Sequence, residues 1–87
     1  MTLSAIVITY NEEKNIPRCL RSLNFVDEVL VVDSHSTDRT RELARQMGAK
    51  VIENDFAGYG QQKNFAANLA KGDWLFFVDA DEEVGLD

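Results

Sequence analysis

The sequence is poor in the residues that build disulfide frameworks and clustered metal sites. Its 87 residues include one cysteine, one histidine and one proline, and a single cysteine cannot form an internal disulfide. Cys19 lies at helical spacing from Ile16, Leu20 and Leu23. This pattern predicts a thiol buried in the core of a protein from a reducing compartment.

Long hydrophobic runs are also missing. No segment approaches the ~18 consecutive apolar residues that suggest a membrane span. The amino terminus lacks a basic segment followed by an apolar core, which a signal peptide would have. We therefore expect neither a signal peptide nor a transmembrane segment in this chain.

Positive charge is scarce as well. Nine Lys and Arg residues stand against fifteen Asp and Glu residues, which gives a formal net charge of −6. A protein that holds nucleic acid through its phosphates needs the opposite balance, so no nucleic-acid partner is expected. A small anionic ligand would be repelled too, unless a cation came with it.

The composition that remains is that of one ordinary globular domain. Hydrophobic residues make up 45% of the chain and charged residues 28%, as in most soluble folded proteins. The length suffices for a single small domain over residues 1–87 and is too short for two.

Apolar runs alternate with helical patterns along the chain. Strands are predicted at residues 3–8, 29–32, 50–53 and 73–78. Three helices are predicted between them. The first runs from an Asn15 cap to Leu23, and the second from a Ser36 cap to Gly48, with Leu43, Ala44 and Met47 as its apolar stripe. The third runs to Ala70, with Phe65, Ala66, Leu69 and Ala70 as its buried face. Nearly continuous apolar strands separated by helices predict an α/β fold, a doubly wound and mainly parallel sheet of about four strands with three helices.

Polar clusters follow three of the predicted strands. They are Thr9-Tyr10-Asn11-Glu12-Glu13, Asp33-Ser34-His35-Ser36-Thr37-Asp38 and Asp79-Ala80-Asp81-Glu82. The carboxyl ends of parallel strands share one edge of the sheet, where open α/β folds bind their ligands. The sequence therefore predicts a ligand site at that edge.

The last cluster has the chemistry of a cation site. Asp79 and Asp81 follow a strand that we expect to be buried, and carboxylate oxygens are the ligands that Mg²⁺ and similar hard cations prefer. A solvated acidic tail is the alternative for such a charge run. The other two clusters favour the cation site.

Four segments together resemble a known family. They are Ile8-Thr9-Tyr10-Asn11-Glu12, Asp33-Ser34-His35-Ser36-Thr37-Asp38, Gln62-Lys63-Asn64, and Gly72-Asp73 ahead of Asp79-Ala80-Asp81-Glu82. In order and spacing, from residue 3 to residue 83, they resemble the inverting GT-A glycosyltransferases of the large "family two" group. Within that group, the sequence of these segments is similar to that of bacterial enzymes that add glucose to lipopolysaccharide core or related cell-surface glycans.

The resemblance implies a reaction and a cofactor. The reaction is transfer of a sugar, with inversion, from a nucleoside diphosphate sugar, expected to be UDP-linked, to a glycan or a lipid-linked acceptor. A divalent metal, Mg or Mn, would neutralise the charge that grows on the leaving diphosphate. The resemblance makes Asp81 the metal ligand and places Asp79 at the ribose and at the metal, through bound water, with Glu82 as a helper.

The resemblance also implies contacts to the donor nucleotide. It places Thr9, Tyr10, Asn11 and Glu12 at the nucleotide sugar, with Tyr10 as an aromatic wall for the base. From the residues alone, Tyr10 can instead be a half-buried residue at a strand end. Asn11 and Glu12 can simply begin the next turn.

Two positions depart from the common family pattern. The resemblance implies that Asp33 contacts the base; the alternative is that it caps its loop. Ser34 stands where most relatives have a second carboxylate, so both the base contact and the identity of the base stay open. Lys63 stands where many relatives have an arginine near the base and phosphates, and there it offers a point charge without the bidentate fork of arginine. The alternative is an exposed lysine on a helix. His35 is expected to be a surface residue, and Asp38 to support the following helix.

An inverting transfer also needs a general base for the acceptor hydroxyl. The resemblance places that carboxylate, and the acceptor pocket, beyond residue 87. We therefore expect the chain to be the truncated amino-terminal, nucleotide-sugar-binding part of a longer bacterial enzyme of cell-envelope glycan biosynthesis, inactive by itself. Its expected location is the cytoplasm or the inner face of the membrane.

Two other classes of protein compete with this interpretation. A metal-dependent phosphoryl-transfer enzyme could place carboxylates at strand ends, but it would need further acidic ligands or a basic face for its substrate. A receiver-like signalling domain could use Asp33 as its phosphoryl acceptor. Such a domain would carry its acidic pair after the first strand, where Thr9-Tyr10-Asn11 stands instead.

Overall fold

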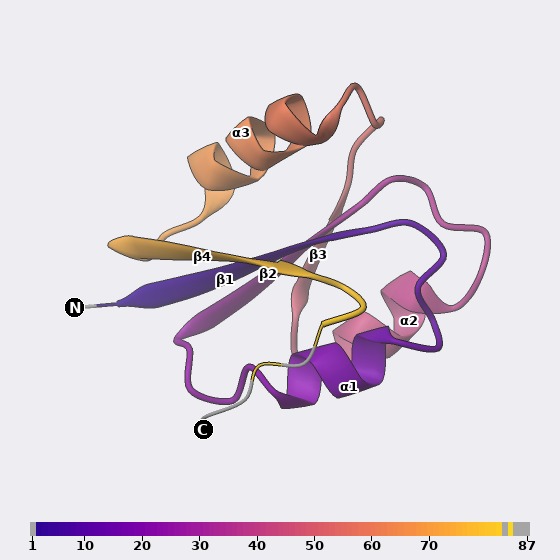
Figure 1. The fold of residues 1–87 in the computed structure, drawn as a ribbon, viewed down its shortest axis with the longest axis horizontal. Coiled ribbons are helices and arrows are strands. Elements are labelled where there is room, and N and C mark those ends of the chain that lie inside the picture. The colour runs from indigo at the N-terminus through magenta and orange to yellow at the C-terminus, as the bar shows by residue number, and fades with distance from the viewer. Residues whose placement is uncertain (1, 83, 85–87) are drawn as a thin grey trace.

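The protein forms one parallel sheet with helices on both faces (Figure 1). A computed structural model describes residues 2–82 and 84. The elements are β1 (Leu3–Thr9), α1 (Ile16–Arg21), β2 (Glu28–Asp33), α2 (Thr40–Gln46), β3 (Lys50–Glu53), α3 (Tyr59–Leu69) and β4 (Trp74–Asp79). Four parallel strands and three helices confirm the predicted doubly wound α/β class.

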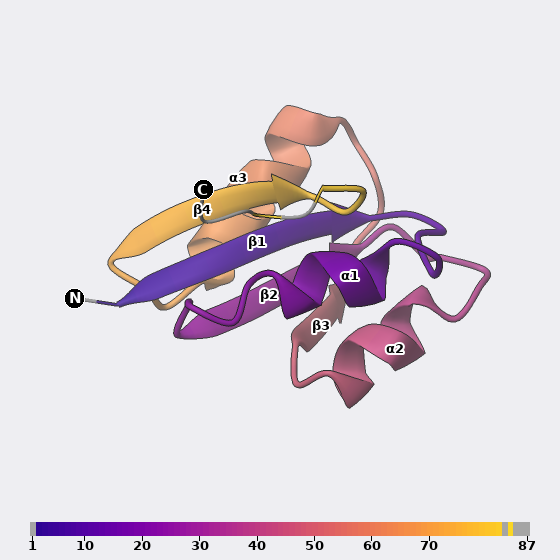
Figure 2. The same cartoon turned by 60° about the horizontal axis from the view of Figure 1, so that its bottom comes forward.

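The strand order determines where a ligand can sit. The sheet order is β3-β2-β1-β4, so the chain builds outward from β1 to β3 and then returns to add β4 on the other side of β1. This reversal makes the boundary between β1 and β4 a topological switch point, where such sheets open a crevice at their carboxyl ends. Figure 2 shows β1 and β4 side by side at this boundary.

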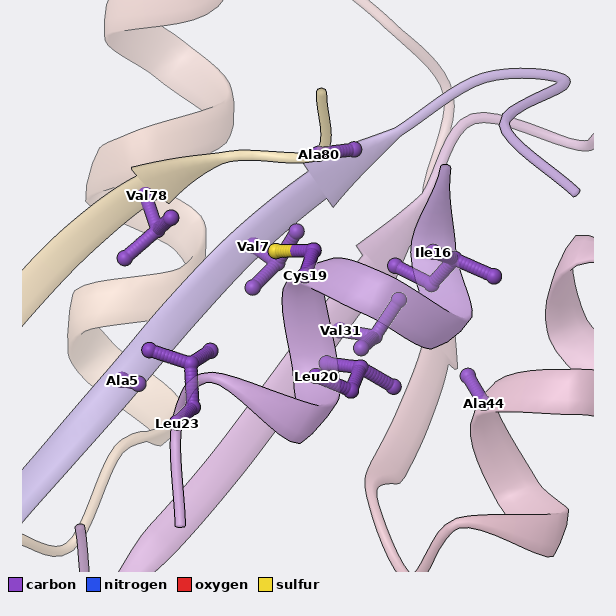
Figure 3. Close-up of a cluster of buried hydrophobic side chains, with 10 residues drawn as sticks. All are labelled: Ala5, Val7, Ile16, Cys19, Leu20, Leu23, Val31, Ala44, Val78 and Ala80. Atoms are coloured by element: carbon purple, nitrogen blue, oxygen red, sulfur yellow. The ribbon is translucent and has the colours of Figure 1, made fainter. Parts of the chain in front are cut away.

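Each face of the sheet packs on its own helices. In Figure 1, α1 and α2 lie on one face and α3 on the other. The first core cluster contains Ala5, Val7, Ile16, Cys19, Leu20, Leu23, Val31, Ala44, Val78 and Ala80 (Figure 3). The second contains Ile6, Leu30, Val32 and Ala66, with Phe65, Leu69 and Ala70 packed against it. Because β1 and β2 bury both faces, their sequences are almost uniformly apolar.

Cys19 is a core residue, as predicted. Its side chain has no exposed surface, and its sulfur lies 3.7 Å from the carbonyl oxygen of Asp79. Figure 3 shows the sulfur directed toward Val7. Burial, followed by the charges of Glu82 and Asp81, raises the pKa of the Cys19 thiol to about 11. A thiol with this pKa stays protonated and unreactive at neutral pH.

Two details of the second predicted helix are wrong. Ser36 does not cap it, because α2 begins at Thr40 with Arg39 at the N-cap position. The Ser36 hydroxyl instead donates to Asp33 and leaves the helix start to later residues. Met47 lies just after α2 and is 39% exposed, so it is not part of the buried stripe. Gly48 has φ 89° and ends the helix in the left-handed conformation, as predicted.

The last strand is less buried than predicted. β4 is at the edge of the described sheet and pairs only with β1. Of its residues only Val78 is buried, while Trp74, Leu75 and Phe77 keep substantial exposed surface. An edge strand has a neighbouring strand on one side only, so its side chains lose less surface to the sheet than those of a central strand, which explains the difference. Within residues 2–82 and 84, no helix has the length and apolar character needed to cross a membrane.

The raised pKa of the Cys19 thiol predicts that the stability of the fold depends on pH. Between the ordinary thiol pKa of 9.0 and about 11, the folded chain keeps a proton that the unfolded chain releases. The free energy of unfolding should therefore fall as the pH rises through this range. In urea titrations at pH 8, 9 and 10, Cys19→Ala should show a smaller fall than the parent chain. Equal falls in both chains would contradict this assignment.

Close backbone packing at the opposite end of the sheet predicts a specific steric defect. A Cβ at Gly72 would lie 2.7 Å from the backbone nitrogen of Ser4 and would collide with its hydroxyl, which accepts a hydrogen bond from the Gly72 N–H. Gly72→Ala should lower the free energy of unfolding by roughly 1–3 kcal/mol. Gly60→Ala is the matched control, since a Cβ there meets nothing within 4 Å. Equal effects at the two sites in urea unfolding would refute the prediction.

Candidate functional site

A pocket of about 440 Å³ opens at the carboxyl edge of the sheet. Its walls come from the end of β1, the first residue after β2 and the segment that leads into α3. The lining residues are Ile8, Thr9, Tyr10, Glu12, Ser34, Phe56 and Tyr59. The strand register explains this convergence, because Thr9 pairs with Asp33 and Ile8 pairs with Asp79. Three strands therefore end at the same edge, as the polar clusters predicted.

Three of the residues that line the pocket are aromatic, namely Tyr10, Phe56 and Tyr59. Tyr10 is 59% exposed and Tyr59 is 69% exposed. Phe56 packs edge-to-face against Tyr59, with ring centroids 5.0 Å apart. Exposed aromatic faces can stack on a planar ring of a ligand. The sequence pointed to Tyr10 but missed Phe56 and Tyr59, although two aromatic residues flanking Gly58 in a loop were a usable signal.

The Asp33 carboxylate holds the loop after β2 to the end of β1. Its side chain has no exposed surface. One carboxylate oxygen accepts from the hydroxyls of Thr9 at 2.6 Å and Ser36 at 2.5 Å, and the other accepts from the Ser36 N–H at 2.7 Å. Arg41 Nε lies 3.7 Å away. A direct base contact by Asp33 is therefore at odds with this geometry, and we correct it to the alternative, a carboxylate that holds the loop.

The β1 loop depends on the same network. Asn11 has φ 52°, and its N–H donates to the Ser36 hydroxyl at 2.8 Å. Its side-chain oxygen accepts from the Thr37 N–H at 2.8 Å. Asn11 can adopt this left-handed backbone at lower cost than most residues. Its side chain thus serves the loop, and whether it also contacts a ligand stays a prediction.

Glu12 has both a structural contact and access to the pocket. Its N–H donates to the Thr40 hydroxyl at 2.8 Å, and its carboxylate accepts from the Asn15 side chain at 3.1 Å. It also lines the pocket beside Tyr10. Four residues at the end of β1 and just after it were predicted to contact the nucleotide sugar, and three of them, Thr9, Tyr10 and Glu12, line the pocket.

Asp38 braces the loop against α2, in line with the structural role expected for it. Its carboxylate accepts from the Thr40 N–H at 2.9 Å and from the Glu13 N–H at 3.1 Å. Burial raises the pKa of Asp38, but the hydrogen bonds from Thr40 and Glu13 outweigh it and leave the pKa below its ordinary value. His35 is exposed, with φ 60°, and its Nε2 lies 2.7 Å from Asp55.

A smaller hollow of about 50 Å³ adjoins the first pocket at the switch point. Ile8 and Tyr59 line both spaces, so the two lie next to each other at the end of β1. Lys63 and Asp79 both line the smaller hollow. The Lys63 ammonium also lies 5.6 Å from the centre of the Phe77 ring. This arrangement puts one positive and one negative side chain where the pocket meets β4.

The acidic turn after β4 has a defined internal structure. The Glu82 carboxylate accepts from the Asp79 N–H at 2.9 Å, and the Glu82 N–H donates to the Asp79 carbonyl at 2.9 Å. Glu82 is thus engaged in closing the turn, while Asp79 and Asp81 are exposed.

The donor set of this turn suits a cation only in part. Across residues 2–82 and 84, no three His, Cys, Asp or Glu side chains come together as a complete metal site. Two exposed carboxylates fit a hard cation whose other ligands come from a bound molecule and water, as Mg²⁺ commonly requires.

The fold and the site define the class of protein. The chain has a doubly wound α/β sheet with an aromatic pocket at the carboxyl ends of its strands, where open α/β folds bind their ligands. The model of the family described as "Glycosyl transferase family 2" matches residues 4–86, and the chain belongs to this family. The predicted resemblance is confirmed.

Relatives of known sequence carry consistent names. The chain is 52% identical over 83 residues to an uncharacterized glycosyltransferase of Rickettsia felis, covering 94% of this chain and 29% of that protein. It is 35% identical over 89 residues to the lipopolysaccharide core biosynthesis glycosyltransferase LpsC of Rhizobium meliloti, covering 97% and 33%. The chain thus spans about three tenths of the length of these relatives.

Solved structures share the fold. TarS residues 1–349 of S. aureus, in complex with UDP, superposes with a TM-score of 0.80 at 38% identity, over 95% of this chain and 28% of that one. The glucosyl-3-phosphoglycerate synthase of Mycobacterium tuberculosis, in complex with Mn²⁺, UDP and glucosyl-3-phosphoglycerate, gives 0.81 at 28% identity, over 94% and 35%.

The buried carboxylate of Asp33 predicts a large cost of substitution. Asp33→Asn replaces one acceptor with an amide group that faces the donors of Thr9 and Ser36. The free energy of unfolding should fall by roughly 1.5–3 kcal/mol, the range for hydrogen bonds to a charged group. Asp55→Asn is the matched control, because its side chain is 94% exposed and surface changes cost ~0.5 kcal/mol or less. Equal costs in urea unfolding would show that the Asp33 network contributes nothing special.

Proposed function

We propose that this chain is the donor-binding, amino-terminal part of a longer glycosyltransferase that uses a UDP-linked sugar and a divalent metal, and that transfers the sugar with inversion. The pocket at the carboxyl edge of the sheet carries the proposal. It offers aromatic faces for a base, and next to it lies a hollow lined by Lys63 and Asp79, where a diphosphate can be held.

The larger pocket suits the nucleoside. Tyr10 and Tyr59 both line it with exposed side chains, and a volume of about 440 Å³ accommodates a base with its ribose. TarS and glucosyl-3-phosphoglycerate synthase, which share the fold, are both known in complex with UDP. We assign the base to this pocket, next to Thr9 and Tyr10.

The smaller hollow suits the diphosphate. Lys63 supplies a positive point charge there, in a hollow that Asp79 also lines. A chain with a formal net charge of −6 repels a diphosphate unless a cation bridges the two. Asp81 and Asp79 would hold that Mg²⁺ or Mn²⁺, which would neutralise the charge on the leaving diphosphate when bound. Glucosyl-3-phosphoglycerate synthase in complex with Mn²⁺ and UDP supports this assignment.

The acceptor side belongs to the proposed remainder of the enzyme. We place the general base and the acceptor pocket beyond residue 87, so the chain alone binds donor without completing transfer. A glycan or lipopolysaccharide-type acceptor agrees with the name of the relative LpsC. We also propose a cytoplasmic location, at or near the inner face of the membrane.

The two competing functions fit the geometry less well. In a receiver-like domain Asp33 would have to accept a phosphoryl group, but its carboxylate is buried and bonded to Thr9 and Ser36. A metal-dependent phosphoryl-transfer enzyme would need further acidic ligands near Asp79 and Asp81. The described part of the chain assembles no third one.

The proposed function predicts metal-dependent binding of UDP. Titration of UDP followed by amide NMR shifts should show tighter binding with Mn²⁺ than without it, with shifts near Tyr10, Lys63 and Asp79. Asp81→Ala should weaken binding in Mn²⁺ by at least about tenfold, since even an outer-shell partner of a metal costs about 10–100-fold. Binding without Mn²⁺ should be unchanged.

Glu42→Ala is the matched control, because it removes one exposed carboxylate on α2, away from the pocket. It should leave both titrations unchanged. Binding of Mg²⁺ with no nucleotide binding would overturn the proposal in favour of phosphoryl transfer. Shifts centred on Asp33 with beryllofluoride would overturn it in favour of a receiver domain.

A further inference from the structure

A short segment, residues 54–58, carries part of the aromatic lining of the pocket. It connects β3 to α3, and Phe56 from this segment lines the pocket beside Tyr59, the first residue of α3. The segment ends at Gly58, with φ 113° and ψ 152°, a backbone conformation essentially restricted to glycine. The position of Phe56 therefore depends on what holds the residues just before it.

A buried amide holds the first residue of the segment. Gln62, on α3, is 1% exposed. Its Nε2 donates to the Asn54 carbonyl at 3.3 Å and to the Ser34 hydroxyl at 3.0 Å, and its Oε1 accepts from the Asn54 side chain at 2.8 Å. The Asn54 N–H donates to the Asp33 carbonyl at 2.9 Å. All these donors are amides, which do not titrate, so they hold Asn54 in the same way at any pH that preserves the fold.

His35 holds the second residue of the segment, Asp55. It follows β2, and its Nε2 lies 2.7 Å from Asp55 Oδ1. Within residues 2–82 and 84, the Asp55 side chain has no other recorded hydrogen-bond or ion-pair partner. Asp55 directly precedes Phe56 in the chain, so this contact restrains the backbone one residue before the ring that lines the pocket.

The strength of this contact depends on the charge of the imidazole ring. A neutral ring can donate one N–H to Asp55, whereas a protonated ring also attracts the carboxylates on both of its sides. The second carboxylate is Glu53 on β3, whose Oε2 lies 4.0 Å from His35 Nδ1. Arg41 on α2 pairs with Glu53 and offsets part of its charge, which leaves Asp55 as the main partner. Histidine changes its charge between about pH 5 and 8.

We propose that His35 is a positioning residue: through Asp55 it holds residues 54–58 so that Phe56 completes the aromatic lining of the pocket, and it holds them less firmly once the ring loses its proton. The inference rests on the proposed function, in which this pocket takes the base of the donor. His35 is not among the residues that line the pocket, so it acts through the segment and not on the ligand. Binding of the nucleoside then carries a contribution that falls as the pH rises.

The test is a titration of the full chain with UMP, without metal, followed by amide NMR shifts at about pH 5.5 and about pH 8. The variant is His35→Asn, because asparagine tolerates the left-handed backbone found here, φ 60°, and carries no charge. At about pH 5.5 the parent chain should bind UMP about two- to fivefold more tightly than the variant, the range for an exposed ion pair. At about pH 8 this ratio should fall toward one. Phosphate esters also titrate near pH ~6, so the two chains are compared only at the same pH.

Asp55 provides a second readout. Asp55→Asn removes the other partner and should cause a similar loss at about pH 5.5. The double variant should lose no more than either single variant, because both changes remove the same contact. Glu42→Gln is the matched control, since it breaks another exposed ion pair, Arg39 Nε to Glu42 at 2.7 Å, whose residues do not line the pocket. It should leave the affinity ratio at one.

A measurement without ligand separates a local effect from a loss of stability. The backbone amide order parameters of residues 55–58 should be lower in His35→Asn than in the parent chain at about pH 5.5. Those of β2 should be the same in both chains. Equal order parameters in the segment would contradict the role of His35.

The outcomes distinguish this inference from the function on which it rests. If the parent chain binds UMP, and its affinity relative to His35→Asn is the same at both pH values, the role of His35 is refuted while donor binding stands. An additive loss in the double variant would refute it as well. If the parent chain does not bind UMP at either pH, with or without Mn²⁺, the proposed function and the role of His35 both fail.

Discussion

The buried carboxylate of Asp33 is the interaction on which the site depends. It accepts hydrogen bonds from Thr9 on β1 and from Ser36 in the loop after β2, and Ser36 in turn receives the N–H of Asn11. One charged group therefore ties together the ends of two neighbouring strands. Hydrogen bonds to a charged acceptor are stronger than neutral ones, and burial leaves no water to replace them. The loops that border the pocket are held from behind by this group.

Around this support, the site divides its residues by burial. Polar groups that hold the scaffold, Asp33 and Gln62, are almost wholly inaccessible. Groups proposed to meet the ligand, such as Tyr10, Tyr59 and Asp81, are exposed. Ser34 stands between the two sets, because Gln62 holds it on one side and the pocket opens on the other. Binding a ligand then needs little rearrangement of the scaffold, which limits the entropic cost of association.

Sequence patterns were most informative where burial is continuous. The apolar runs of β1 and β2 and the left-handed turn at Gly48 were predictable, because each follows from local chemistry. Patterns were less informative at loops, where polar side chains choose among several partners. Serine is a common helix cap, but in the folded chain the Ser36 hydroxyl donates to Asp33 instead. The same competition turned Asp33 from a candidate ligand contact into a support.

The sequence by itself determined the α/β class, the order of the elements and the chemistry available at the strand ends, because period, turn residues and carboxylate spacing are local properties. Tertiary structure alone decided which of those polar residues are buried and which face the pocket. Gln62 shows why: its amide meets Ser34, 28 positions away in the chain, only after α3 crosses the sheet and returns the chain to β4. Contacts between such distant residues depend on packing, which no local pattern encodes.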